Sequence, residues 1–130
     1  MSIPLRSVGA ITMFVDDIAV AKEWYERAFE LTVLFEDAQS VAFRLDNTII
    51  NMLQIDEAPD LVGPARVAPA AAGSRSQMTI WVDDVDATCA ELAERGVALV
   101  NGPIDRPWGQ RTACLADPDG HLWEVASTIS

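Results

Sequence analysis

In the first half of the chain, hydrophobic residues recur first with the period of a strand and then with the period of a helix. Residues 8–15 alternate with the period of two that is typical of a strand with one buried face. From Asp17 onward the period is that of a helix, because the apolar positions share one helix face: Ala21, Trp24, Tyr25 and Ala28. β-Branched and aromatic segments then predict three strands, over residues 31–36, 40–45 and 48–55.

The second half of the chain repeats this order. A strand is predicted over residues 77–82, and the carboxylate of Asp84 is suited to cap a following helix. Gly96 stands where a left-handed helix end is expected. Three strands complete the half, over residues 97–100, 111–116 and 121–127. Each half therefore predicts the order strand, helix and three strands.

The two halves also match in sequence. ITMFVDDI at residues 11–18 corresponds to MTIWVDDV at residues 78–85. DNTIINM at residues 46–52 corresponds to DGHLWEV at residues 119–125, and both begin with a dipeptide typical of a tight turn. The order of the two matches indicates a duplicated module.

A segment of different composition separates the halves. Residues 57–76 are rich in Ala, Pro, Gly and Ser and have no sustained period, which predicts a linker. We therefore expect residues 1–130 to form a single domain, with a first module at residues 1–56 and a second at residues 77–130.

Composition and charge exclude several classes of function. Half of the residues are hydrophobic and 22% are charged, which is typical of a globular chain. The net charge of −11 argues against nucleic acid and against an anionic membrane surface as partners. No apolar run reaches the roughly 18 residues of a membrane-spanning helix. The N-terminus lacks the layout of a signal peptide, and the two cysteines form no framework, so we expect a cytoplasmic protein with reduced thiols.

The duplicated module, the two VDD helix starts and the closing DPDGHLWEV together resemble the vicinal oxygen chelate superfamily, the glyoxalase and bleomycin-resistance group. The resemblance covers nearly the whole chain. It implies an α+β fold in which two tandem βαβββ modules curl into a cup-shaped, half-open barrel. It also implies a homodimer, in which subunits often exchange modules.

The resemblance further implies where a metal would be held. Metal-dependent members place ligands at positions that correspond here to Ala10, Asn51, Gln77 and Glu124. Only Glu124 is a strong ligand type, because a methyl group donates nothing and carboxamides are weak donors to a transition metal. We therefore expect the fold without a metal or other cofactor, and without catalytic residues.

Strand alternation predicts which side chains line the cup. Phe14 and Trp81 could stack on a planar or cationic ligand, Glu124 could supply a counter-charge, and Trp108 in the segment IDRPWGQR could lie over the ligand as a lid. The alternatives are a buried role for the three aromatic residues and a solvated one for Glu124. The predicted ligand-binding residues are Thr12, Phe14, Ile49, Asn51, Leu53, Thr79, Trp81, Trp108 and Glu124.

These observations favour a metal-independent protein that sequesters a hydrophobic, cationic or planar aromatic small molecule, such as an antibiotic. The alternative is a divalent-metal-dependent lyase, isomerase or dioxygenase that uses Glu124 and Gln77. A third hypothesis is a regulatory or interaction module whose cup no longer binds a ligand. The pattern leaves open the identity of the ligand and whether linker 57–76 closes over it.

Overall fold

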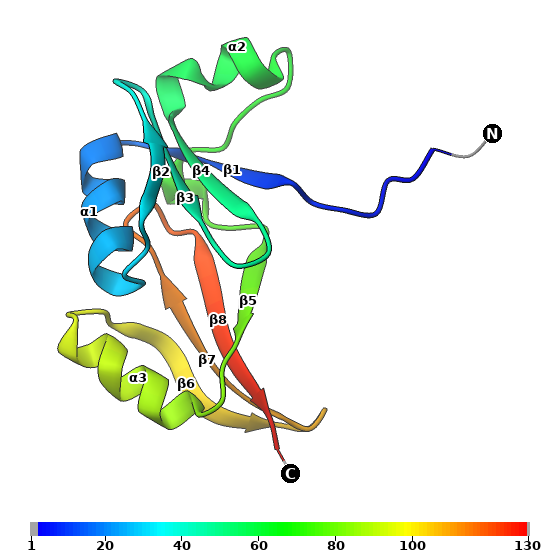
Figure 1. Cartoon of the computed structure of the whole chain (residues 1–130), viewed down its shortest axis with the longest axis vertical. Helices are drawn as coiled ribbons and strands as arrows, with labels where there is room; N and C mark the ends of the chain where they lie inside the picture. Colours follow the sequence, from blue (N-terminus) through cyan, green and yellow to red (C-terminus); the bar gives the residue numbers. More distant parts are fainter. Residues whose placement is uncertain (1–2, 130) are drawn as a thin grey trace.

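The computed structural model describes residues 3–129 and contains two four-stranded sheets, each covered on one face by a helix (Figure 1). The first module contains β1 (Ala10–Val15), α1 (Ile18–Ala28), β2 (Val33–Glu36), β3 (Ser40–Arg44) and β4 (Ile49–Gln54). Its strand order is β1-β4-β3-β2, with β1 parallel to β4 and the other neighbours antiparallel.

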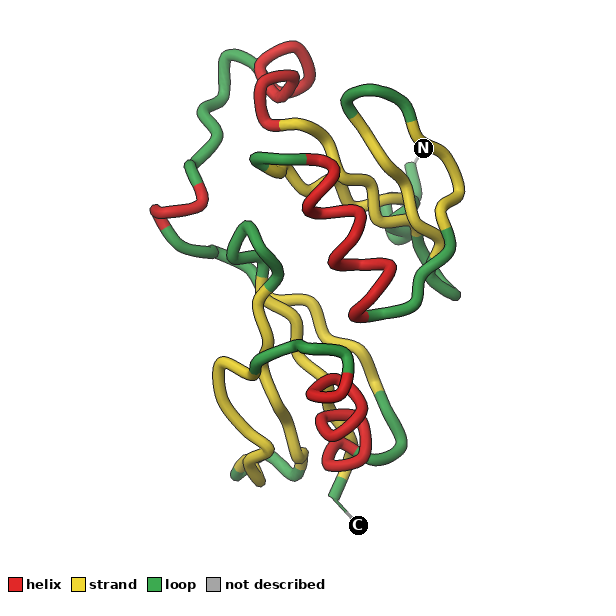
Figure 2. Tube along the Cα trace, turned by 90° about the vertical axis from the view of Figure 1, so that its left-hand side faces the viewer, coloured by secondary structure: helices red, strands yellow, loops and turns green. Residues whose placement is uncertain are grey.

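The second module has the same topology. It contains β5 (Gln77–Trp81), α3 (Val85–Glu94), β6 (Leu99–Arg106), β7 (Gln110–Ala116) and β8 (Leu122–Thr128). Its strand order is β5-β8-β7-β6, and β5 is again parallel to β8. The two sheets remain separate and neither closes into a barrel (Figure 2). The predicted α+β duplication is therefore confirmed.

The predicted helix ends are also confirmed. The Asp17 carboxylate accepts hydrogen bonds from the amides of Ala19 and Val20, and that of Asp84 accepts one from Ala87. These bonds satisfy amides that have no partner within the helix. Gly96 follows α3 with a φ of 79°, a left-handed conformation that favours glycine.

Three predicted segments differ from the structure. The first strand begins at Ala10, so residues 8 and 9 lie outside it. Linker 57–76 is partly helical, with η1 (Ile55–Glu57) at its start, then α2 (Ala58–Val62) and η2 (Ala70–Ala72), although these elements are too short to leave a helical period. β6 continues well beyond residue 100, because it pairs with β7 through a hairpin whose turn is only residues 107–109.

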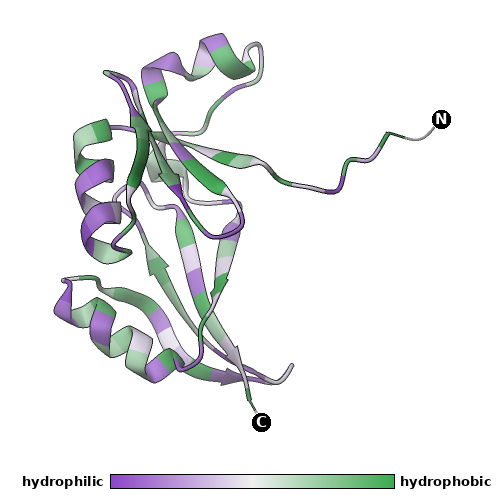
Figure 3. Ribbon diagram, viewed as in Figure 1, coloured by the Kyte–Doolittle hydropathy of each residue, from purple (hydrophilic) through white to green (hydrophobic). Residues whose placement is uncertain are grey.

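The core lies between the helices and the sheets and is continuous across both modules. α1 packs on its own sheet and also reaches the second one (Figure 2), where the Phe29 ring lies edge-on to Trp123 at a centroid distance of 5.1 Å. Tyr25 and Trp24 are buried, as the helical period predicted. Hydrophilic residues follow the outer sides of the helices (Figure 3). The glutamates on and next to the two helices are all exposed: Glu23, Glu26, Glu30, Glu91 and Glu94.

A buried polar contact joins the two modules. The Tyr25 hydroxyl donates to Asp117 Oδ2 at 2.5 Å and accepts from Trp123 Nε1 at 2.9 Å. Asp117 is only 5% exposed, so this hydrogen bond satisfies a carboxylate that is removed from water. Helix α1 is thereby fixed to the turn that precedes β8.

Among residues 3–129, no helix is both long enough and apolar enough to cross a membrane.

Candidate functional site

Each sheet has one face packed on helices and one opposite face, which we call its open face. In the first sheet, Met13, Val15 and Met52 are buried on the helix side. The alternating positions lie on the open face: Thr12, Phe14, Ile49, Asn51 and Leu53. The assignment of faces by alternation is consistent with the burial of every second residue along β1.

Two polar residues on this open face bind each other. Thr12 lies opposite Asn51 in the parallel pair of β1 and β4. Asn51 Nδ2 donates to Thr12 Oγ1 at 3.4 Å. Phe14, the next residue on that face of β1, is half-buried and lies opposite Leu53. The open face of the first sheet is therefore mainly apolar, with one carboxamide at its centre.

The open face of the second sheet is more polar. Thr79 lies opposite Glu124, and its hydroxyl donates to Glu124 Oε1 at 2.8 Å. Glu124 makes no ion pair with the described residues, which leaves the negative charge available. Trp81 is 63% exposed at the edge strand β5, so it is a surface aromatic and not a core residue.

The four positions that correspond to metal ligands do not form a suitable donor set. Ala10 has no donor atom, and the carboxamides of Asn51 and Gln77 each donate a hydrogen bond within their own sheet. Gln77 Nε2 donates to Cys114 Sγ at 3.4 Å. Glu124 is then the one strong ligand, whereas a transition-metal site usually has three or four. These residues do not fit a resident transition metal.

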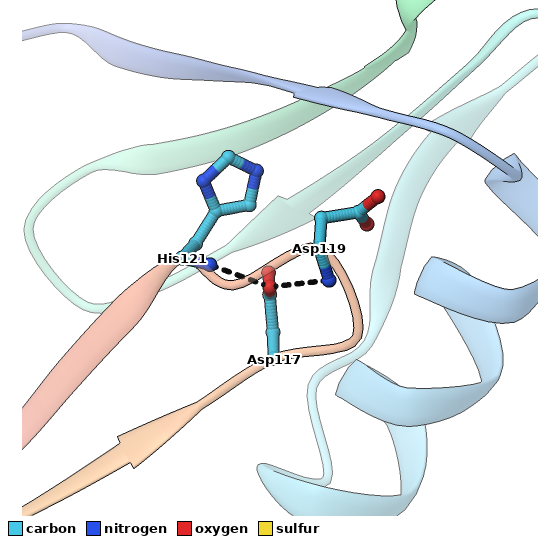
Figure 4. Close-up of side chains that lie close together, drawn as sticks. All are labelled: Asp117, Asp119 and His121. Carbon is cyan, nitrogen blue, oxygen red and sulfur yellow. Dashed lines mark hydrogen bonds between the residues drawn. The ribbon is translucent and has the colours of Figure 1, made fainter. Parts of the chain in front are cut away.

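The turn before β8 contains a group that resembles a metal site in its residue types. Ligand atoms of Asp117, Asp119 and His121 lie within 4.8 Å of one another (Figure 4). Several of these atoms already have partners, since Asp117 Oδ1 accepts from the amides of Asp119 and His121, and Asp119 Oδ1 accepts from the amide of Asp16. The carbonyl oxygen of Phe14 accepts a hydrogen bond from His121 Nε2 at 3.0 Å. These contacts tie the turn to the first module, so His121 is structural.

Burial affects one carboxylate of this turn. Desolvation raises the pKa of Asp119, and the nearby Asp117 and Asp16 act in the same direction, while the hydrogen bond from the Asp16 amide opposes the shift. The raised pKa has its cause in the packing of the turn between the modules.

Sequence reasoning missed a cluster of polar residues on the open face of the second sheet. Arg106 Nε donates to Thr112 Oγ1 at 2.9 Å, and its Nη2 donates to Asn101 Oδ1 at 3.4 Å. The Arg106 guanidinium carbon lies 5.8 Å from the centroid of the Trp108 ring. The pattern treated residues 101–110 as a loop. The Pro-Trp-Gly sequence was the signal that could have predicted a hairpin here, because its turn makes Arg106 and Gln110 cross-strand partners.

Trp108 lies at the tip of the β6–β7 hairpin. It is 64% exposed, and its Nε1 donates to Gln110 at 3.3 Å. This exposure excludes the interpretation of Trp108 as a plug of the core. Arg111 on the neighbouring strand is an anchor, because it forms ion pairs with Asp86 and Asp105.

A cleft of about 1300 Å³ opens between the modules, mainly on the helix side of the sheets. Of the predicted ligand-binding residues, Thr79 and Trp81 line this cleft, and the others do not. The structure therefore distributes the predicted site over the two open faces and the hairpin tip. The apolar wall of the cleft includes Ile11, Ile50, Met78, Ile80, Trp123 and Val125.

Three solved structures share this fold. A glyoxalase/bleomycin resistance protein/dioxygenase from Nocardioides superimposes with a TM-score of 0.89 at 17% identity, covering 99% of this chain and 87% of the other. A lactoylglutathione lyase from Agrobacterium tumefaciens has a TM-score of 0.77 at 18% identity, covering 95% of both chains. TnmS3, an antibiotic binding protein from Streptomyces sp. CB03234, has a TM-score of 0.73 at 25% identity, covering 98% of this chain and 99% of its own.

The sequence comparison identifies the family. A model of the Glyoxalase/Bleomycin resistance protein/Dioxygenase superfamily matches residues 7–125. This range contains both strand-helix-strand modules and the DPDGHLWEV ending, which is consistent with the duplicated topology described above. The chain belongs to the Glyoxalase/Bleomycin resistance protein/Dioxygenase superfamily.

Proposed function

We propose that this chain is a small-molecule-binding protein that sequesters a hydrophobic, planar aromatic or cationic ligand without a resident metal and without breaking a bond. The donor set carries the proposal. Of the four strand positions suited to a metal, only Glu124 has a strong ligand group, and the amides of Asn51 and Gln77 donate within the sheets. A single carboxylate without further strong donors suits an organic cation better than a transition metal.

The side chains of the open faces support binding of such a ligand. Phe14 and Leu53 supply apolar surface on the open face of the first sheet, and Trp81 supplies an aromatic ring on that of the second. Glu124 supplies a fixed negative charge in a chain whose net charge is already −11, which attracts cations. An aromatic face contributes roughly 0.5–2 kcal/mol to the binding of a cation, depending on desolvation. Similarity to an antibiotic binding protein at 25% identity agrees with an antibiotic as one ligand class.

We include a homodimer in the proposal, with a second copy seated along the sheet edges. Within residues 3–129, β1 pairs only with β4 and β5 pairs only with β8, so each has an unpaired edge. The N-terminal segment extends away from both sheets (Figure 1) and exposes Ile3 and Leu5. Unpaired edges and exposed apolar segments are typical sites of pairing between chains. Sedimentation should show a dimer, and a monomer at ligand-binding concentrations would contradict this part.

Titration with rhodamine 123, a planar cation, tests the proposed binding. Quenching of tryptophan fluorescence should give a Kd well below about 1 mM. Glu124→Gln should weaken binding roughly fivefold, the effect of losing one partly exposed charge contact of about 1 kcal/mol. Glu94→Gln is the matched control, because Glu94 is exposed on α3. Failure of rhodamine 123 and of other planar cations to bind would favour the interaction-module hypothesis.

Elemental analysis separates the proposal from the enzymatic alternative. Protein purified without chelator should contain no stoichiometric transition metal. A stoichiometric metal that is lost in Glu124→Ala would refute the proposal and favour a lyase, isomerase or dioxygenase that uses Glu124 and Gln77.

A further inference from the structure

We propose that Arg106 is a second charged anchor of the ligand site and binds an anionic group, so that the preferred ligand is a planar molecule with a cationic and an acidic end. The inference rests on the proposed function and narrows its ligand class. It adds a specificity-determining residue on β6 that faces the same side of the sheet as Glu124.

The environment of Arg106 differs from that of the other partly buried arginines. Arg95 forms ion pairs with Glu30 and Glu91, and Arg111 forms ion pairs with two aspartates. Within residues 3–129, Arg106 has no carboxylate partner, although the whole chain has 20 acidic and only 9 basic residues. The positive charge of Arg106 is therefore available to an anionic group of another molecule.

Neutral groups hold the Arg106 guanidinium in place. Nε donates to the hydroxyl of Thr112, which is only 1% exposed, and Nη2 donates to Asn101. The Trp108 ring lies beside the guanidinium carbon at 5.8 Å. These contacts fix its direction without neutralising its charge. Nη1 donates to no acceptor among the described residues. A planar fork of this kind suits a carboxylate, which it binds with two parallel hydrogen bonds.

The Arg106 side chain extends along the sheet toward the row of Glu124. Arg106 itself lies opposite Gln110, which lies opposite Thr128, but its Nη2 donates to Asn101. Asn101 lies opposite Cys114, and Cys114 lies opposite Glu124, so two strand steps of about 10 Å in total separate Asn101 from Glu124. The buried side chains of Thr112 and Cys114 form the floor between the charges. A fused-ring cation that carries a carboxylate on a substituent could place its two charges across this floor.

Aromatic residues flank this floor on both sides. Trp108 lies at the β6–β7 turn and Trp81 on the edge strand β5, and both are exposed by more than half. Stacking on either ring would hold a planar body while the charged ends reach Arg106 and Glu124. The edge strand β5 and the β6–β7 turn therefore supply apolar contacts, and the strands between them supply the floor.

A matched pair of dyes tests the proposal. Rhodamine 110 and rhodamine 123 share a planar cationic body, but the first has a free carboxylate and the second its methyl ester. At about 0.15 M salt, which screens the net charge of the protein, the wild-type chain should bind rhodamine 110 at least about tenfold more tightly. Arg106→Gln should remove this preference and leave the affinity for rhodamine 123 within about twofold.

Two further variants separate ligand binding from a structural role of Arg106. Arg66→Gln changes an exposed arginine of the linker and should retain the preference. Arg106→Lys keeps the charge without the planar fork and should retain only part of the preference for rhodamine 110. Urea unfolding of each variant establishes that the fold is intact.

The outcomes distinguish this inference from the function on which it rests. Equal affinity of the wild type for both dyes, or a preference that survives Arg106→Gln, would overturn the role of Arg106 and leave the proposed binding function standing. Absence of binding by both dyes and by other planar cations would overturn the proposed function, and the inference would fall with it.

Discussion

Replacing Tyr25 with phenylalanine tests whether the buried hydroxyl holds the two modules together. The hydroxyl donates to the Asp117 carboxylate at 2.5 Å and accepts from the indole of Trp123 at 2.9 Å, and all three residues are buried. Burial and the Asp117 carboxylate raise the pKa of Tyr25, so its hydroxyl stays protonated and remains a donor at neutral pH. Tyr25→Phe keeps the ring and removes both hydrogen bonds.

The structure gives the size of the effect. Losing a hydrogen bond to a charged group costs about 1.5–3 kcal/mol, and an unpartnered buried N–H adds about 1–3 kcal/mol before relaxation. We expect the free energy of unfolding to fall by about 3 kcal/mol, a large part of the 5–15 kcal/mol typical of a domain. For 130 residues, an unfolding entropy of about 2.1 cal/mol/K per residue converts this loss into a decrease in Tm of about 10 °C.

Urea unfolding followed by tryptophan fluorescence measures this loss. Thr48→Val is the matched control, because it removes a hydroxyl hydrogen bond at an exposed position, to the carbonyl of Val8, and should cost less than about 0.5 kcal/mol. A double-mutant cycle with Asp117→Asn should give a coupling energy of about 1–2 kcal/mol. A loss below about 1 kcal/mol in Tyr25→Phe would refute the reasoning, since Asp117 Oδ2 and the Trp123 N–H would then need no partner.

Two further predictions concern backbone conformation and pH. Gly102→Ala should destabilise the fold by several kcal/mol more than Gly109→Ala in thermal unfolding. Both glycines have φ near 90°, but a Cβ at Gly102 would lie 2.6 Å from the Thr112 carbonyl oxygen, whereas one at Gly109 would meet nothing within 4 Å. Equal losses of stability in the two variants would contradict this explanation. The hydrogen bond and charge of Arg111 lower the pKa of Asp86 below its usual 3.8, so this ion pair stabilises the fold above that pH and the contribution disappears as the pH falls through the lowered value. Asp86→Asn should therefore be less stable than wild type at pH 7, and the difference should shrink as the pH falls below 3.8, whereas a pH-independent difference would contradict the ion-pair explanation.

The sequence repeat predicted the architecture well because its signals are local. The period of two gave the faces of β1 and β5, and the helical period gave the buried side of α1. The capping carboxylates Asp17 and Asp84 marked both helix starts, and Gly96 the end of α3. Each of these features depends on residues close in sequence, so one chain without relatives was enough.

The candidate site depended on contacts that no local period encodes. β6 continues to Arg106 because β7 pairs with it beyond the Gly102 irregularity, and this pairing brings Arg106 to Thr112. Sequence spacing had assigned this stretch to a loop, and so the positively charged part of the open face was not predicted. The position of each predicted residue on its strand face agreed with alternation, whereas the distribution of those faces over two separate sheets came only from the structure.

The order of elements, the faces of the strands and the weak metal donor set were thus determined by the amino-acid sequence alone, because they follow from residue types and short spacings. The tertiary structure decided how α1 docks on the second sheet, since Tyr25 and Asp117 are 92 residues apart. It also decided that the cleft between the modules lies mainly on the helix side and that Arg106 has no acidic partner among residues 3–129. Such features depend on contacts between side chains from distant segments, and hydrophobic periodicity along the chain does not predict those contacts.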